Sequence, residues 1–317
     1  MVDKQGYLSP QYAGSLGAIG RSIPLESSKG YLLKRTIDNF PYNDAIGCYP
    51  LFCCSNWDML GNDLNNIQDS IVSVALVTDP LGEYSFSKLK AIFTDVCYPY
   101  KTHYLVYLEL YDFDHVQKNH RRNAESALKS LQIERLEKPD KYFDDWIELY
   151  HNLVFRHAIK GFADFSEESF KKQFATDGLI MYRAGYNDTT VGMVMFYEMN
   201  NNVYYHLGAY SDDGYSKRAS FAIFKVAIEY FKYRGYKWLS LGGAAGLAET
   251  GKTDGLVRFK KGWSNATGTA YFCGKIINKE AYQKMCLKKN ISGNGYFPLY
   301  RKTENNSEES LKQKAVL

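Results

Sequence analysis

Residues 238–263, WLSLGGAAGLAETGKTDGLVRFKKGW, decide how this chain is interpreted. The stretch begins with a short apolar run that predicts a buried strand, and a double glycine, Gly242 and Gly243, ends that strand. Residues 246–253 then fit the G-x-x-x-x-G-K-[ST] pattern of a nucleotide-binding P-loop. The stretch closes with a basic segment, residues 258–263. Two interpretations follow: a phosphate-binding loop, or the floor of a cleft followed by a basic helix.

The P-loop interpretation lacks its architecture. Such a loop opens a sizeable parallel-sheet domain, in which a later strand ends in an acidic residue that holds magnesium. The chain after Thr253 is short and largely polar, and no apolar strand there ends in Asp. A helix beginning at Lys252 would also contain Gly255 and Gly262, each of which costs about 1 kcal/mol relative to Ala. We therefore interpret the match as an accident in a glycine-rich loop and rank a P-loop NTPase last.

The composition describes a soluble globule. Hydrophobic residues make up 45% and charged residues 23% of 317 residues, which is enough for two medium domains. The net charge of +4 permits an anionic partner such as CoA, a nucleotide-linked sugar or tRNA without requiring one, and no DNA partner is expected. The first residues lack the apolar core of a signal peptide, and no run is long enough to span a membrane. We expect a cytoplasmic protein.

Six cysteines show neither C-x-x-C nor Cys/His metal spacing, so we expect reduced thiols and no metal site.

The C-terminal half shows a clear order of elements by its periodicity. Ser166, followed by two glutamates, predicts the start of a helix. Asn200, Asn201 and Asn202 predict a tight turn between two strands. The predicted strands are 131–136, 179–183, 190–199, 203–210, 237–241 and 269–277, and the predicted helices are 140–159, the one from Ser166, 216–234 and 254–263. The N-terminal half predicts strands at 30–34, 45–53, 71–77 and 103–110, with helices at 85–95 and 116–130.

Several short motifs follow one another in a specific order: YKTHY at 100–104, HRRN at 120–123, YYHLGA at 204–209, LGG at 241–243 and RFKKGW at 258–263. In this order and spacing the chain resembles the FemABX family of tandem GNAT-like transferases. Some members add amino acids from aminoacyl-tRNA to peptidoglycan precursors, and relatives are GNAT-type acyltransferases of envelope or polysaccharide pathways.

The resemblance implies an α/β (α+β) fold with two GNAT-like mixed-sheet domains in tandem, of which the second is better resolved from sequence. We expect a diverged N-terminal domain at 1–130, an acyltransferase domain at 131–290 and a partly disordered extension at 291–317.

The resemblance also implies a donor site. GNAT acetyltransferases hold the CoA pyrophosphate on an R/Q-x-x-G-x-G/A loop before the long helix, but here residues 211–220 read SDDGYSKRAS. The glycine pattern is absent, although Lys217 and Arg218 at the helix start can meet phosphate. Acyl-CoA is the expected donor, and an acyl donor of another kind stays open. Gly242 and Gly243 complete the expected donor site as the cleft floor, or else mark only a turn.

For catalysis, the resemblance places the basic segment in the cleft, where Lys260 would neutralise developing negative charge. His206 is the histidine of its strand and would accept or relay a proton, unless it only packs there. Arg258, Lys261 and Arg122 are the expected substrate contacts, with an ordinary solvated basic surface as the alternative. Phe259 and Trp263, four residues apart, should share the packing face of the helix, with Arg258 and Lys261 on another face.

The expected function is transfer of an acyl group from a thioester donor, acyl-CoA or similar, to an amino group of a cell-envelope or polysaccharide precursor, as in an N-acetyltransferase. The acceptor would be a small molecule or a lipid- or nucleotide-linked saccharide or peptide. One alternative is an aminoacyl-tRNA-dependent peptidoglycan bridge transferase, although no heptads of a tRNA-binding coiled-coil arm are present. A second alternative is a non-catalytic GNAT-fold binding protein.

Overall fold

The computed structural model describes residues 4–67, 71–244, 255–293 and 295–302. The P-loop match at 246–253 and the predicted frayed tail from residue 303 lie outside these residues. The chain forms two compact units. Unit 1 contains residues 1–6 and 102–268, and unit 2 contains residues 7–101 and 269–317.

Unit 1 is built on a mixed sheet with the strand order β5-β10-β9-β8-β7-β6. The β9–β10 pair is parallel, and the other neighbours are antiparallel. Asn200 and Asn201 have the left-handed φ values of 50° and 60° that the predicted turn between β8 and β9 requires. The strands are β5 (Val96–Tyr107), β6 (Gln132–Arg135), β7 (Leu179–Tyr186), β8 (Thr189–Met199), β9 (Asn202–Tyr210) and β10 (Trp238–Ser240).

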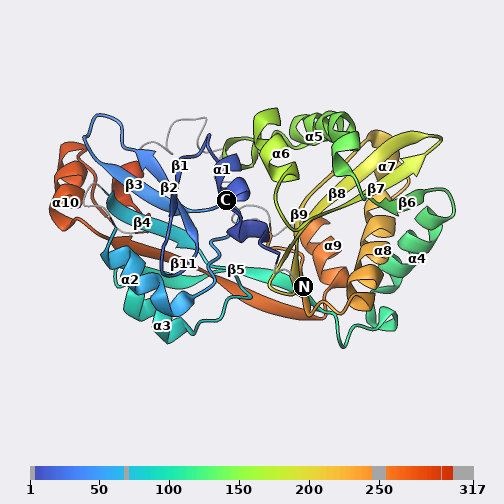
Figure 1. Ribbon diagram of the computed structural model, residues 1–317, viewed down its shortest axis with the longest axis horizontal. Helices are drawn as coiled ribbons and strands as arrows, with labels where there is room; N and C mark the ends of the chain where they lie inside the picture. Colours follow the sequence, from blue (N-terminus) through green and yellow to red (C-terminus); the bar gives the residue numbers. More distant parts are fainter. Residues whose placement is uncertain (1–3, 68–70, 245–254, 294, 303–317) are drawn as a thin grey trace. The chain divides into compact units, whose positions relative to one another are not determined.

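Helices cover both faces of this sheet (Figure 1). Alternate strand residues such as Val194, Phe196 and Val203 form one core with apolar residues of α4 and α8. On the opposite face Tyr197 and His206 contact residues of α6 and the loop before it, and Trp146 of α5 packs on α6. The helices are α4 (Lys118–Leu128), α5 (Phe143–His157), α6 (Glu167–Phe174), α7 (Asp212–Ser216), α8 (Ala219–Tyr233) and α9 (Gly255–Trp263).

The helix predicted at 216–234 is α8, and a separate short helix, α7, precedes it. Ser211 caps α7, since its Oγ accepts a hydrogen bond from Gly214 N at 3.2 Å. Arg218 then takes a left-handed conformation with a φ of 60°, and α8 begins at Ala219. The prediction did not include α7, because a helix of five residues is too short to show apolar periodicity.

Unit 2 has the strand order β1-β2-β3-β4-β11, in which β3 and β4 are parallel and the other neighbours antiparallel. Its strands are β1 (Arg21–Pro24), β2 (Tyr31–Thr36), β3 (Asn43–Gly47), β4 (Ile71–Val77) and β11 (Ala266–Ile276), and its helices are α1 (Pro10–Ser15), α2 (Leu60–Asn65), α3 (Phe86–Ile92) and α10 (Lys279–Lys288).

The two units repeat one topology. In unit 2 two antiparallel pairs, β1–β2 and β2–β3, precede the parallel pair β3–β4, and β11 pairs antiparallel with β4. In unit 1 the pairs β7–β8 and β8–β9 precede the parallel pair β9–β10, and β5 pairs antiparallel with β10. The tandem mixed-sheet fold predicted from sequence is therefore present, although no direct sequence repeat reveals it.

The unit limits differ from the predicted boundaries at residues 130 and 290. The chain crosses between units inside two strands: β5 enters unit 1 at Thr102, and β11 enters unit 2 at Thr269. In sequence order, β5 of unit 1 therefore follows strands β1–β4 of unit 2, and β11 of unit 2 follows strands β6–β10 of unit 1. Part of the predicted extension is also ordered, because Tyr300 is fully buried in unit 2 and its hydroxyl lies 2.7 Å from Ser73 Oγ. Local sequence patterns cannot show such long-range pairing.

Candidate active site

The sheet of unit 1 opens where β10 ends. β10 pairs with β9 only as far as Ser240 opposite Tyr204. Beyond that point the chain stays with β5, because Leu241 N donates to Tyr104 O at 2.9 Å and Tyr104 N donates to Gly242 O at 3.1 Å. β9 continues to Tyr210. From Tyr205 onward, this edge of β9 has no strand partner among the residues that the structure describes.

Lys260 lies at this opening. The side chain comes from α9 and is 7% exposed. Its Nζ donates a hydrogen bond to Gly243 O at 2.6 Å and lies 5.8 Å from the centroid of the Tyr205 ring. Tyr205 is the first residue of β9 beyond its pairing with β10. A buried ammonium group beside a carbonyl and an aromatic face is held in one place.

The double glycine is required by this geometry. Gly242 has a φ of +80°, which side chains other than hydrogen rarely allow, and a Cβ on it would lie 3.1 Å from Lys260 Nζ. A Cβ on Gly243 would lie 3.3 Å from both Thr102 O and His103 Cδ2. The two glycines therefore let Lys260 and His103 approach the backbone closely, which is consistent with a cleft floor.

Aromatic packing fixes the orientation of α9. His120 of α4 lies in contact with the rings of Phe221, Phe259 and Trp263. Its Nε2 donates to Phe259 O at 2.9 Å, and burial lowers the pKa of His120, so the ring is neutral near pH 7. Trp263 is buried and Phe259 packs on the same core, which confirms the predicted packing face of this helix.

The three predicted substrate contacts are exposed, whereas Lys260 is buried. Arg258 and Lys261 are exposed on α9, on the face predicted for them. Arg122 is exposed on α4, where it donates to Asn119 Oδ1 at 3.4 Å. Their roles as substrate contacts stay predictions.

The predicted phosphate contacts lie at the start of α8. Lys217 Nζ sits 3.7 Å from the centroid of the Tyr186 ring, and Arg218 is the left-handed residue before the helix. Asp212 pairs with Arg156. The backbone N–H groups of residues 214, 215, 217 and 218 donate to acceptors within residues 211–215.

His206 and Lys260 lie on opposite faces of the sheet. Side chains alternate along β9, and Tyr205 packs with α8 and α9 while His206 faces α6. His206 Nε2 is 3.2 Å from Gln173 Oε1, and the ring contacts Tyr197 and Phe165. Burial lowers the pKa of His206 to about 3, so it is a weak base near neutral pH. These surroundings do not favour the proton-relay role that was predicted for His206.

Sequence reasoning assigned no role to Tyr205, whose ring lies beside Lys260, or to His103, which lies close to Gly243. His103 lies in the YKTHY motif and is buried against Gly243. Tyr205 adjoins His206, and strand alternation gives the two opposite faces. The pairing of β5 with β10, which brings His103 to the site, leaves no local signal in the sequence.

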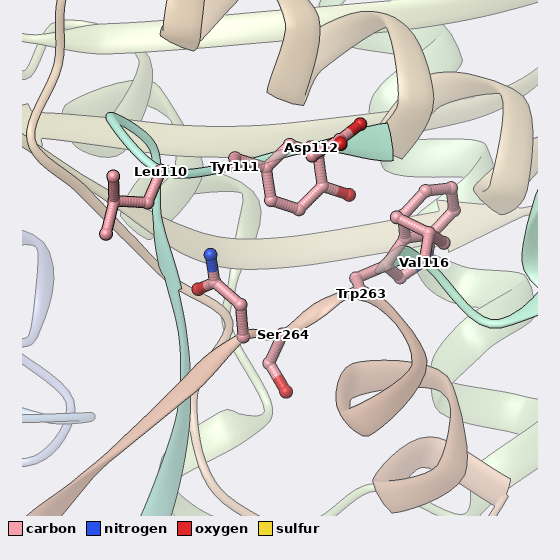
Figure 2. Close-up of a pocket in the computed structure, with 7 residues that line it drawn as sticks. Leu110, Tyr111, Asp112, Val116, Trp263 and Ser264 are labelled. Carbon is pink, nitrogen blue, oxygen red and sulfur yellow. The ribbon is translucent and has the colours of Figure 1, made fainter. Parts of the chain in front are cut away.

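A small pocket lies beside the C-terminal end of α9 (Figure 2). Its volume is about 40 Å³, far below the several hundred Å³ that a drug-sized ligand fills. Tyr111 and Trp263 line it, and their hydroxyl and Nε1 groups have no hydrogen-bond partner in the described ranges. It is large enough for ordered water, not for an acyl donor.

Residues 114–260, from just before α4 to Lys260, match the family model of an acetyltransferase (GNAT) domain. The chain is similar in structure to FemX, with a TM-score of 0.64, 13% identity, and coverage of 87% of this chain and 94% of FemX. It has a FemABX-like GNAT fold.

Two further structures share this FemABX-like fold. One is the C-terminal domain of a putative lysylphosphatidylglycerol synthetase from Agrobacterium fabrum, with a TM-score of 0.61, 12% identity, and coverage of 89% of this chain and 93% of that domain. The other is L-PGS from Bacillus licheniformis, with a TM-score of 0.59, 12% identity, and coverage of 92% and 97%. No curated protein sequence matches the chain.

Among the helices of the described residues, none has the length and apolar character needed to cross a bilayer.

Proposed function

We propose that this chain is an acyltransferase that moves an acyl group from a thioester or ester donor to an amino group of a cell-envelope or polysaccharide precursor. The observation that supports it most is the position of Lys260, whose Nζ binds Gly243 O where β10 leaves β9. The GNAT-type fold of the chain agrees with this chemistry.

The opening supplies what acyl transfer needs. Backbone groups on the unpaired edge of β9 can hold the donor carbonyl in one orientation. The Lys260 ammonium lies next to that edge and would stabilise the negative charge that develops on the carbonyl oxygen or the leaving group. Arg258, Lys261 and Arg122 would contact an anionic acceptor, such as a nucleotide-linked peptide or saccharide, from the exposed surface.

The segment before α8 supports a second candidate for the acyl donor, namely an aminoacyl ester such as aminoacyl-tRNA. A CoA pyrophosphate needs free backbone N–H groups before the long helix. At that position the N–H groups of residues 214, 215, 217 and 218 bond within the segment, and two aspartates, Asp212 and Asp213, stand beside them. One fold neighbour is named for lysylphosphatidylglycerol, an aminoacylated lipid. Acyl-CoA is therefore the weaker donor proposal.

A transfer assay tests the function. The full chain is incubated with radiolabelled acetyl-CoA, or with tRNA charged with a mixture of labelled amino acids, and with a nucleotide-linked cell-wall peptide that carries a free amine. We expect label to reach the peptide from one donor. Lys260→Met keeps the side-chain volume without the charge and should slow transfer about 100-fold or more. Lys129→Ala, an exposed lysine at the end of α4, is the matched control.

The two arms separate the outcomes. Transfer from acetyl-CoA would reverse our preference for an aminoacyl ester. Absence of transfer from both donors, or full transfer by Lys260→Met, would refute the proposed function.

A further inference from the structure

We propose that the hydroxyl groups of Tyr205 and Tyr210 together hold the carbonyl oxygen of the acyl donor. This inference rests on the proposed acyl transfer at the opening of unit 1, and it names the side chains that orient the donor there.

Both tyrosines lie on the part of β9 that extends beyond β10. The pairing with β10 ends at Tyr204, and β9 continues to Tyr210. Lys260 lies on the same face of the sheet as Tyr205, since its Nζ is 5.8 Å from the centroid of that ring. The two hydroxyls therefore belong to the opening at which acyl transfer is proposed.

A shift in strand register brings the two tyrosines to one face of the sheet. Phe196 of β8 lies opposite Tyr205. Two residues earlier on β8, Val194 lies opposite Gly208, so β9 has one extra residue in this interval. The extra residue puts Tyr205 and Gly208, three positions apart, on the same face. Tyr210, two residues beyond Gly208, shares that face by alternation.

The two hydroxyls meet over Gly208. A Cβ on this glycine would lie 3.0 Å from the hydroxyl oxygen of Tyr205 and 3.0 Å from that of Tyr210. In the part of the chain that the structure describes, neither hydroxyl has a hydrogen-bond partner. Because both oxygens are 3.0 Å from one point, an acceptor atom near that point can take a hydrogen bond from each.

Packing fixes both rings. The centroid of the Tyr205 ring is 5.1 Å from that of Phe224 on α8, and the centroid of the Tyr210 ring is 5.6 Å from that of Tyr215 on α7. Gly192 makes room for Tyr210, since a Cβ there would lie 2.5 Å from its Cδ1. Burial raises the pKa of both hydroxyls, so each keeps its proton at neutral pH and acts as a donor. Donors held in place before the reaction need no reorganisation.

The surroundings favour a carbonyl oxygen as the ligand atom. Two neutral O–H donors match an oxygen that accepts two hydrogen bonds. The Lys260 ammonium on the same face repels a cation and attracts an atom that gains negative charge. In acyl transfer, the donor carbonyl oxygen is such an atom.

The hydroxyls donate hydrogen bonds and keep their protons throughout. The neutral acceptor amine attacks the carbonyl carbon, a C–N bond forms, and the π electron pair of the C=O bond moves to the oxygen, where both hydrogen bonds strengthen. That pair then restores the C=O bond as the bond from carbon to the donor oxygen or sulfur breaks. Water takes a proton from the amine nitrogen and gives one to the leaving atom. The products are an amide and the free alcohol or thiol.

Steady-state kinetics with the donor that supports transfer test the assignment. Tyr205→Phe and Tyr210→Phe keep each ring and remove its hydroxyl. Each should lower kcat about 100-fold while the donor KM changes less than about threefold, because the lost hydrogen bond is stronger in the transition state. Tyr182→Phe is the matched control and should keep kcat. It removes a buried hydroxyl that lacks a partner in the described ranges, on β7, which β8 and β9 separate from β10.

Gly208→Ala tests the same space from the backbone side, with both tyrosines intact. Its Cβ would lie 3.0 Å from each hydroxyl oxygen, where the ligand atom is proposed to sit, so kcat should fall by a similar factor. This variant also serves if thermal unfolding shows that a phenylalanine variant is unstable.

The outcomes distinguish the assignment from the function. If the unaltered chain transfers label and the phenylalanine variants keep its kcat, or change only the donor KM, the assignment is refuted and the proposed function stands. An unchanged kcat in Gly208→Ala would refute it in the same way. If the unaltered chain transfers nothing from either donor, both the function and the assignment are refuted.

Discussion

The imidazole of His120 fills the space where a side chain on Gly262 would project. A Cβ atom on Gly262 would lie 2.2 Å from both Cε1 and Nε2 of His120. The same Nε2 donates to Phe259 O, so α4 and α9 are joined by steric fit and by a hydrogen bond. Because α9 carries Lys260, this contact also sets where the buried amine lies.

Gly262→Ala should therefore destabilise the protein. The added methyl group forces the His120 ring away from Phe259 O, and overpacking of this kind costs about 1–3 kcal/mol. Urea unfolding measures the change in free energy. Gly255→Ala is the control on the same helix, because a Cβ there meets nothing within 4 Å. Equal stability of the two variants would contradict the steric fit.

Gly242→Ala should affect both stability and transfer. Its φ of +80° strains an alanine by about 1 kcal/mol or more, and the new Cβ would press on Lys260 Nζ. Gly235 has a similar φ of +77° with open space around it, so Gly235→Ala should cost comparable stability and leave transfer unchanged. Thermal unfolding and the transfer assay together separate the two effects, and equal transfer rates would show that Gly242 does not position Lys260.

His206 should make stability depend on pH. Its pKa is about 3 in the folded chain and near 6.5 when unfolded, so below pH 6.5 only the unfolded state takes up the proton. The free energy of unfolding should fall as the pH drops from 6.5 toward 4, by up to about 1.4 kcal/mol per pH unit. His206→Gln should remove that part of the slope, whereas His151→Gln should not. Parallel slopes for all three chains would disprove this contribution.

Asp44 should be important for the stability of unit 2. It is 1% exposed and accepts hydrogen bonds from Arg35 Nε at 2.9 Å and Arg301 Nε at 2.5 Å. Asp44→Ala leaves two guanidinium groups without their shared carboxylate, and we expect a loss of about 3–5 kcal/mol in urea unfolding. Asp58→Ala breaks an exposed pair with Lys88 and should cost less than about 1 kcal/mol. A loss no larger than this control would refute the role of Asp44.

The sequence predicted most elements of unit 1, because their apolar periodicity is local. The turn at Asn200 and Asn201 and the cap at Ser166 were predictable for the same reason: each depends on the backbone preference of its own residue type. The pairing of β5 with β10 was not predictable, because it joins residues more than 100 positions apart. The predicted domain limits differ from the observed units for that reason.

The site was predictable in part. Lys260 and the double glycine stood out by motif, and the structure brings them together. The choice of His206 over Tyr205 could not be decided from the strand alone, because alternation shows that neighbours face opposite ways without showing which face is the site.

The order of strands along the chain has a consequence for biosynthesis. β4 pairs with β11, which the ribosome adds only after all of unit 1 has been made. The nascent chain therefore exposes one edge of β4 during that interval, and the later half of the protein obtains its complete set of strands before the earlier half does. We expect a chaperone that shields strand edges to associate with the emerging N-terminal half until β11 leaves the exit tunnel.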